Sequence, residues 1–169
     1  AEDSALLAEA AIDDMTHPEC VLEVGTGSGW VAEQVADETD ARVVGSDLNP
    51  HACRQARGRG VAAVRADLTG PFAADRVDAV LFNPPYLPTD PDNEWGDWME
   101  HALSGSEDGR RLIRPFLDDV GRVLTAEGVV YLLVSSLTGY ELVVDLAREA
   151  GFAATELPTA PHPLEALSV

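Results

Sequence analysis

The sequence predicts an α/β protein, in which a mostly parallel sheet is covered by helices on both faces. Segments with strand character alternate with segments with helix character along most of the chain. Several strand segments are apolar at successive positions, as expected for strands that are buried on both faces. A glycine-rich turn at residues 25–29 joins the first strand to the following helix. These features indicate one three-layer domain that spans residues 1–169.

The individual elements follow from periodicity and from turn residues. We expect strands at 21–24, 41–46, 61–64, 77–82, 129–135 and 152–157, with 164–169 as the start of a seventh. We expect helices at 3–16, 30–37, 110–124 and 139–150, and one more that Asn49 caps and Gly58 ends. Pro18 is expected to end the first helix. The loop of about 25 residues after Asn83 is too long for a simple connection, which indicates a functional loop.

Length and composition place the chain among globular proteins. It has 169 residues, of which 46% are hydrophobic, so it can form one core and is not disordered. No apolar run reaches the ~18 residues of a membrane-spanning helix, and the acidic N-terminus lacks the basic start of a secretory signal. Cys20 and Cys53 lie far apart, and no histidine has a partner at ligand spacing. We therefore expect a soluble cytoplasmic protein without a disulfide scaffold or a metal site.

The charge of the chain is strongly unbalanced. Acidic residues number 30 against 11 basic ones, all of them arginine, which gives a net charge of −19. Such a charge would normally argue against a nucleic-acid partner. Together with the absence of lysine, it indicates instead the salt-rich cytoplasm of an extreme halophile, where the Debye length falls to about 3 Å. The charge then reflects solubility in salt and reveals little about the substrate.

The first motif with chemical meaning lies at the turn after the first strand. It reads Glu23-Val24-Gly25-Thr26-Gly27-Ser28-Gly29. Glycines at such a turn let the backbone pass close to a ligand, and the helix N-terminus offers free N–H groups. A dinucleotide-binding turn has GxGxxG spacing, whereas this turn has GxGxG followed by Trp30. The turn indicates a cofactor site, with a tight turn that binds nothing as the alternative.

Two further acidic residues follow strand segments. Asp47 ends the second strand, where a carboxylate can accept two hydrogen bonds from a ribose diol. An exposed surface acid is the alternative in so acidic a chain. Asp67 follows the third strand and can accept from an adenine amine, while Leu68 packs on the ring. The three strand ends would then face one crevice at the carboxyl edge of the sheet.

The fourth strand leads directly into a distinctive tetrapeptide, Asn83-Pro84-Pro85-Tyr86. An amide or aryl amine nitrogen is a poor nucleophile because its lone pair is delocalised. If the Asn83 side chain and the Pro84 carbonyl accept its two N–H bonds, the lone pair is directed away from them. The prolines stiffen the backbone and remove competing N–H groups, and Tyr86 offers a flat stacking face. The alternative is a stiff loop without chemistry.

Together these motifs resemble class I S-adenosylmethionine-dependent methyltransferases of the release-factor glutamine N5-methyltransferase family, in its archaeal and eukaryotic branch. The resemblance covers essentially the whole chain and implies a Rossmann-like, mostly parallel sheet of seven strands. The Asn-Pro-Pro-Tyr element is shared with DNA adenine methyltransferases, whereas Glu2-Asp3-Ser4 and Leu87-Pro88-Thr89 favour this branch. The implied cofactor is S-adenosylmethionine. The residues that would contact it are Ser4, Glu23, Gly25, Thr26, Gly27, Gly29, Asp47, Leu48, Asp67, Leu68 and Asn83.

The resemblance also implies a reaction and two partners. The segment 83–86 would hold the glutamine of a Gly-Gly-Gln motif in a class I translation termination factor. The family needs a small zinc-binding activator subunit, which would form a heterodimer at the edge of the sheet near the third strand, residues 61–64. The chain departs from the family at 104–109, Ser-Gly-Ser-Glu-Asp-Gly, and its last strand stops at Val169. We expect direct displacement of the methyl group by the oriented nitrogen, without a general base.

Other interpretations remain open. A nucleic-acid amine methyltransferase predicts a target-recognition segment, and none is visible in a chain of this length, so nucleic acid is disfavoured as substrate. A nicotinamide oxidoreductase predicts GxGxxG spacing, and a non-catalytic scaffold does not require Asn83. Protein lysine remains an alternative acceptor. The arginine cluster at 54–65 fits a partner or RNA surface, but a solvated helix face is favoured, and Trp95 and Trp98 fit a substrate mouth or loop packing equally well.

Overall fold

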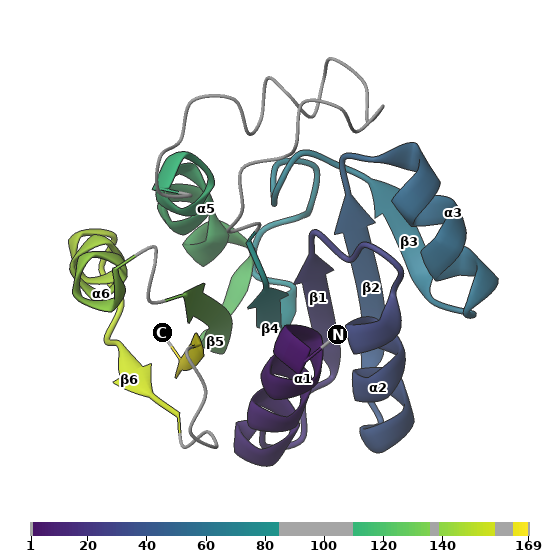
Figure 1. The fold of residues 1–169 in the computed structure, drawn as a ribbon, viewed down its shortest axis with the longest axis horizontal. Coiled ribbons are helices and arrows are strands. Elements are labelled where there is room, and N and C mark those ends of the chain that lie inside the picture. The colour runs from purple at the N-terminus through teal and green to yellow at the C-terminus, as the bar shows by residue number, and fades with distance from the viewer. Residues whose placement is uncertain (1, 85–109, 136–138, 158–163, 169) are drawn as a thin grey trace.

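The arrangement of strands confirms the α/β class. The computed structural model describes residues 2–84, 110–135, 139–157 and 164–168. The strands are hydrogen-bonded in the order β3-β2-β1-β4-β5-β7-β6 (Figure 1). Strands β1 to β5 are parallel, whereas β7 is antiparallel to both of its neighbours. The strands are β1 (Cys20–Val24), β2 (Arg42–Asp47), β3 (Ala62–Arg65), β4 (Val77–Phe82), β5 (Leu124–Ser135), β6 (Thr155–Glu156) and β7 (Leu164–Ser168).

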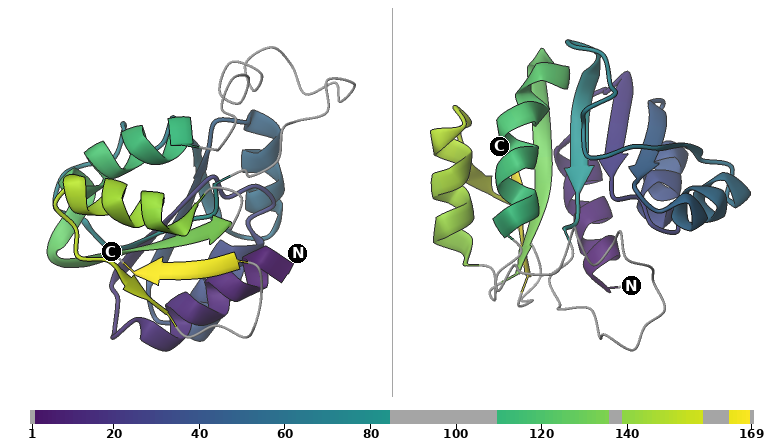
Figure 2. Two further views of the ribbon diagram at one scale, coloured as in Figure 1. Left: turned by 60° about the vertical axis from the view of Figure 1, so that its left-hand side comes forward. Right: turned by 90° about the horizontal axis from the view of Figure 1, so that it is seen from above.

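Helices cover both faces of the sheet. Figure 2 shows α5 and α6 on one side and α1 on the other. The helices are α1 (Glu2–Asp14), α2 (Trp30–Glu38), α3 (Pro50–Gly58), α5 (Arg110–Val123) and α6 (Tyr140–Glu149). Side chains that alternate along the strands supply one core to each side. Along β5, Tyr131 and Leu133 join the core of α1, α2 and α3, whereas Val130, Leu132 and Val134 join the core of α5 and α6. This period of two explains why the strands read as continuous apolar runs.

Three elements have a boundary that differs by two or more residues from the sequence-based expectation. The first helix ends at Asp14, so Pro18 lies beyond it and does not end it. Strand β5 begins at Leu124 instead of 129, because Leu124 already pairs with Val77. The sixth strand is limited to Thr155–Glu156 instead of 152–157. Its first residues close the end of α6 instead, since the Phe152 N–H donates to the Ala147 carbonyl at 3.0 Å.

The expected start and end of α3 are confirmed. The Asn49 side chain accepts a hydrogen bond from the His51 N–H at 2.8 Å, and Pro50 is the first helical residue. The helix ends at Gly58, and Gly60 follows with a φ of 86°. These local signals worked because capping depends on neighbouring residues alone. Among the helices that the structure describes, none combines the length and apolarity needed to cross a membrane.

Candidate functional site

The carboxyl ends of the central strands bring the predicted site residues to one edge of the sheet. The register places Val24 opposite Ser46 on one side and opposite Phe82 on the other. Because these strands are parallel, the residue that follows each of them lies at the same level. Those next residues are Gly25, Asp47 and Asn83. The structure therefore assembles the glycine turn, the acid after β2 and the start of the tetrapeptide in one row.

The glycine turn is held by its own backbone and by β2. The Thr26 N–H donates to the Ser46 carbonyl, and the Gly29 N–H donates to the Thr26 carbonyl, both at 2.8 Å. Gly29 has a φ of 80°, and a Cβ there would come within 2.7 Å of Ala56 in α3. Gly27 has a φ of 54°, and a Cβ there would meet nothing within 4 Å. Gly29 is thus required for packing, whereas Gly27 leaves open space beside the turn.

Glu23 organises this turn from inside the protein. Its side chain is 4% exposed, and Oε2 accepts hydrogen bonds from Thr26 Oγ1 at 2.6 Å and from the Ala32 N–H at 3.1 Å. Burial raises the pKa of this carboxyl to about 7, against the lowering effect of both hydrogen bonds. The same two bonds tie β1 to the turn and to the first turn of α2. The sequence alone did not reveal this internal role.

Asp47 presents a fixed carboxylate at the end of β2. Its Oδ2 accepts from the Gly27 N–H at 2.9 Å, and its Oδ1 accepts from the Asn49 N–H at 2.8 Å. The residue is half-buried, as is the neighbouring Leu48. Each carboxylate oxygen can accept more than one hydrogen bond, so both keep acceptor capacity for a ligand. This geometry suits the diol of a ribose, as the sequence predicts.

The segment after β3 reaches the same edge. The Ala66 N–H donates to the Asp47 carbonyl at 3.1 Å, which brings the following Asp67 beside β2. Asp67 is exposed, and Leu68 is half-buried with a φ of 47°. A left-handed conformation is unusual for leucine and persists only where the surroundings enforce it. Ser4 is half-buried in the first turns of α1.

The side chain of Asn83 contains a polar atom in an unusual environment. Its Oδ1 is buried and has no hydrogen-bond partner among the described residues. Leaving such an acceptor unpaired costs about 1–3 kcal/mol, so the site suits a ligand that brings an N–H donor. Pro84, the next residue, is buried. Pro85 and Tyr86 lie outside the described residues, as do Trp95, Trp98 and the segment 104–109.

Two other expectations concern metals and the arginine cluster. The described residues contain no group of histidine, cysteine, aspartate and glutamate that could hold a metal ion. In the cluster, the Arg57 guanidinium donates to the Ala63 carbonyl, and Arg65 Nε donates to the Leu48 carbonyl. Arg59 pairs with Glu33 at 2.8 Å. These arginines therefore also connect α3 and β3 to their surroundings.

A mostly parallel sheet with a glycine turn after β1, acids at the ends of β2 and β3, and an asparagine after β4 is the arrangement of a class I S-adenosylmethionine-dependent methyltransferase. Comparison with known proteins agrees, since residues 21–103 match the family described as "Methyltransferase domain". The chain is 34% identical to MJ0928 of Methanocaldococcus jannaschii, which is assigned as a protein N5-glutamine methyltransferase; the match covers 90% of this chain and 79% of the relative. It is 31% identical to human methyltransferase HEMK2, over 100% of this chain and 86% of the relative. The chain belongs to the family of the release factor glutamine methyltransferases and HEMK2, and is a methyltransferase.

A solved structure and a bacterial relative show how much of each chain the similarity covers. The E. cuniculi Mtq2–Trm112 complex, described as responsible for the methylation of the translation termination factor eRF1, superposes with a TM-score of 0.76. The identity is 29%, and the match covers 99% of this chain and 94% of that chain. The release factor glutamine methyltransferase of Moorella thermoacetica is 31% identical, but the match covers only 58% of its length.

Proposed function

We propose that this protein transfers the methyl group of S-adenosylmethionine to the side-chain amide nitrogen of a protein glutamine. The substrate that we propose is the glutamine of the Gly-Gly-Gln motif in a class I translation termination factor. The names of MJ0928 and of the Mtq2–Trm112 complex support this choice. The observation that carries the proposal is the buried Oδ1 of Asn83, an acceptor without a donor among the described residues.

The row of strand ends fits the cofactor. S-adenosylmethionine supplies an electrophilic methyl group, and the residues of the chain bind and orient what carries it. Asp47 would accept from the ribose hydroxyls, and Asp67 with Leu68 would hold the adenine. Gly25 and Gly27 would let the turn approach the cofactor, since both have positive φ and a Cβ at Gly27 would enter open space. The remaining contacts that we propose are those of Ser4, Glu23, Thr26, Gly29, Leu48 and Asn83.

Asn83 and Pro84 would orient the acceptor nitrogen. A primary amide has two N–H groups, and Asn83 Oδ1 would accept one while the Pro84 carbonyl accepts the other. Both bonds lie in the amide plane, which leaves the nitrogen lone pair directed out of that plane toward the methyl group. The nitrogen would gain the methyl group as the bond from that group to the sulfonium sulfur breaks, which leaves S-adenosylhomocysteine, and the nitrogen would release one proton to solvent. Pro85 would keep competing N–H groups away, and Tyr86 would stack on the planar group.

Transfer of labelled methyl groups to a termination factor tests this function. The expected result is labelling of the natural factor and none of a variant in which the Gly-Gly-Gln glutamine is replaced by asparagine. Equal labelling of both would exclude this glutamine and leave lysine as the alternative acceptor. Labelling of DNA or RNA in a parallel reaction would favour a nucleic-acid amine instead. Each reaction is run with and without the co-purified small subunit.

We also propose that a small zinc-binding activator subunit docks on the edge of the sheet at β3. The likeness to the Mtq2 chain of the Mtq2–Trm112 complex supports such a partner. Strand β3 is the last strand on its side of the sheet, and Val64 on it is 40% exposed. Residues 48–66 contain four arginines and no acidic residue, in a chain with a net charge of −19. An open strand edge with an apolar and basic surface suits an acidic partner that adds a strand.

The remaining proposals concern the whole chain. We propose that residues 1–169 act as one methyltransferase domain with a seven-stranded sheet, in which β7 and β6 form one margin. Both cores pack on this same sheet, which supports one domain.

We propose that the protein works in a cytoplasm of high salt, as the acidic composition without lysine suggests. A termination factor as substrate agrees with that location.

A further inference from the structure

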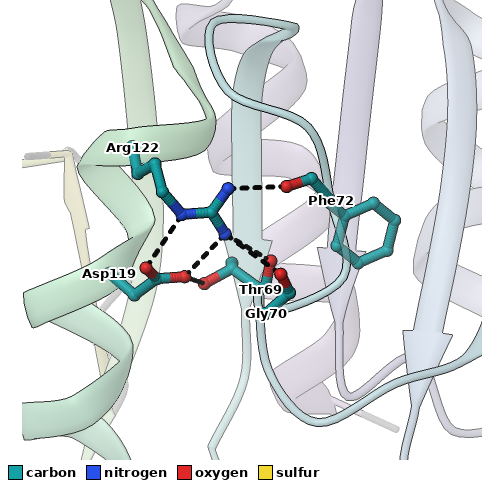
Figure 3. Close-up of polar contacts among 5 residues, drawn as sticks. All are labelled: Thr69, Gly70, Phe72, Asp119 and Arg122. Carbon is teal, nitrogen blue, oxygen red and sulfur yellow. Dashed lines mark hydrogen bonds and ion pairs between the residues drawn. The ribbon is translucent and has the colours of Figure 1, made fainter.

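One arginine fastens the loop that carries Asp67 and Leu68. The segment 66–76 connects β3 to β4 through turns only. Arg122, near the end of α5, donates from Nη1 to the Phe72 carbonyl at 2.6 Å and from Nη2 to the carbonyls of Thr69 at 3.0 Å and Gly70 at 3.3 Å (Figure 3). Three carbonyl groups of the loop backbone thus accept hydrogen bonds from one guanidinium.

Asp119 holds this guanidinium in place and reaches the loop itself. Arg122 Nε donates to Asp119 Oδ1 at 3.0 Å, and Nη2 donates to Oδ2 at 2.9 Å, a two-pronged pairing (Figure 3). Oδ2 also accepts from Thr69 Oγ1 at 2.7 Å, and the Thr69 side chain is fully buried. Hydrogen bonds from Arg122 and Thr69 lower the pKa of the Asp119 carboxyl, so it stays ionised. The planar fork of arginine suits this geometry better than lysine would.

The far end of the loop is closed by the same helix. The Asp75 N–H donates to the Arg122 carbonyl at 3.1 Å, and the Arg76 N–H donates to the Val123 carbonyl at 2.9 Å. The loop is therefore fixed to α5 at both its middle and its end. Leu68 lies between β3 and the first of these contacts, and its left-handed backbone needs such support to persist.

We propose that Arg122, together with Asp119 and Thr69, positions Asp67 and Leu68 for the adenine ring of the cofactor. This inference rests on the proposed role of Asp67 and Leu68 in cofactor binding. The contacts run to the loop and not to Asn83. We call the contacts of Arg122, Asp119 and Thr69 with the loop the clamp. Loss of the clamp should weaken cofactor binding while methyl transfer at saturating cofactor continues. The KM for the cofactor should therefore rise with little change in kcat.

The chain offers a matched control on the next helix. Arg148 and Asp145 of α6 have the same spacing of three residues, at 3.6 Å and with both side chains 65% exposed. Within the described part of the chain this pair makes no hydrogen bond to a loop carbonyl, so it represents an ordinary surface pair of small energetic value. Arg148→Ala should therefore leave cofactor affinity unchanged.

Titration calorimetry of the full chain with S-adenosylhomocysteine and with 5′-methylthioadenosine tests the clamp without a methyl acceptor. Arg122→Ala and Thr69→Val should weaken both ligands by about tenfold, because each removes hydrogen bonds that hold the loop. Thr69→Ser retains the hydroxyl and should restore affinity. Asp67→Ala serves as the reference for the adenine contact itself. Thermal unfolding measures whether each variant is folded, and the comparison of Thr69→Val with Thr69→Ser keeps the test valid if Arg122→Ala does not fold.

The outcomes separate the clamp from the proposed function. Weak binding by Asp67→Ala, Arg122→Ala and Thr69→Val, with kcat retained, supports the clamp. Weak binding by Asp67→Ala alone would overturn the clamp and leave the cofactor site standing. Unchanged binding by Asp67→Ala would overturn the adenine contact and the clamp with it. A loss of kcat equal to the loss of affinity in Arg122→Ala would also overturn a purely positioning role.

Discussion

At the scale of single residues, Asn83 and Glu23 each have a polar side-chain group in a position where burial costs free energy. Asn83 has a buried Oδ1 without a donor among the described residues, and Glu23 has a carboxyl whose pKa is raised by burial. Neither arrangement stabilises the folded chain by itself, since unpaired acceptors and buried charges are costly. Such costs concentrate where a ligand or a reaction makes use of them.

Replacing Asn83 by alanine should separate catalysis from stability. We expect methyl transfer to fall about 100- to 1,000-fold, because an acceptor that orients the nucleophile is lost. The affinity for S-adenosylhomocysteine should fall only modestly. The free energy of unfolding should stay the same or rise by up to about 1 kcal/mol, since an unpaired buried carbonyl is removed. Full activity of the variant in a labelled-methyl assay would contradict the proposed mechanism.

The raised pKa of Glu23 makes stability depend on pH in a defined direction. The carboxyl has an ordinary pKa of 4.5 and a pKa of about 7 in the folded protein. Between these values the unfolded chain has lost the proton while the folded protein retains it. Raising the pH through this window should therefore lower the free energy of unfolding, by about 3 kcal/mol in total.

Glu23→Gln should lack this component, because its amide does not titrate. Urea unfolding at constant salt, from pH 4.5 to 8, measures the difference between the two proteins. That difference should grow in favour of the variant up to pH 7 and then level off. Parallel pH profiles would show that Glu23 has an ordinary pKa. Other carboxyls, such as Asp78 and Asp119 with their lowered pKa values, contribute equally to both proteins and cancel.

At the scale of elements, the sheet contrasts a protected margin with an open one. On one side β7 and β6 cover β5, whereas on the other side β3 has β2 as its only neighbour within the described sheet. Strand β3 has only four residues, and a short edge strand limits unwanted pairing. The exposed Val64 and the arginines of 54–65 are the features on which the proposed docking of a partner at this edge rests.

Val64→Asp should prevent co-purification of the small subunit. The change removes an exposed apolar side chain and adds a negative charge to the segment 48–66, which has no acidic residue of its own; both effects are unfavourable for an acidic partner. Pull-down of the tagged chain, followed by mass analysis, measures the effect. Ala153→Asp is the control, because it adds the same charge at an exposed position near the opposite margin of the sheet. Equal recovery of the subunit with both variants would place the interface elsewhere.

At the scale of the whole molecule, charge is the dominant property. A net charge of −19 on 169 residues produces self-repulsion that favours the unfolded chain at low ionic strength. Salt weakens this repulsion, since the Debye length falls from about 10 Å at 0.1 M to about 3 Å at 1 M. Exposed ion pairs such as Arg114 with Glu149 contribute little against it.

The melting temperature should therefore rise with salt. Between 0.1 M and 2 M KCl we expect an increase of about 5–10 °C, which corresponds to roughly 2 kcal/mol. Differential scanning calorimetry at pH 8 measures it, and the same series in NaCl serves as the control, because screening does not distinguish the two cations. A melting temperature independent of salt would contradict adaptation to a salt-rich cytoplasm.

Local signals predicted much of the fold and of the site. The sequence identifies the strand ends at Asp47 and Asn83 because each apolar segment is followed directly by polar or turn-forming residues. Such a pattern involves neighbouring residues only. The predicted boundaries failed where one backbone group can belong to either of two elements. Phe152 illustrates this, since its N–H closes α6 and delays the sixth strand. The role of Glu23 as the internal anchor of the turn was also missed, because it depends on burial.

The sequence alone determined the α/β class, the order of motifs along the chain and the acidic composition without lysine, because periodicity, capping and composition do not depend on tertiary contacts. Only the tertiary structure decided which atoms are left without partners and which distant residues meet. Arg122 lies far from the cofactor motifs in sequence, yet its guanidinium binds the loop beside Asp67 and Leu68. An arginine three residues after an aspartate on a helix is common in any sequence, and only the packing of α5 against that loop gives this pair its contacts.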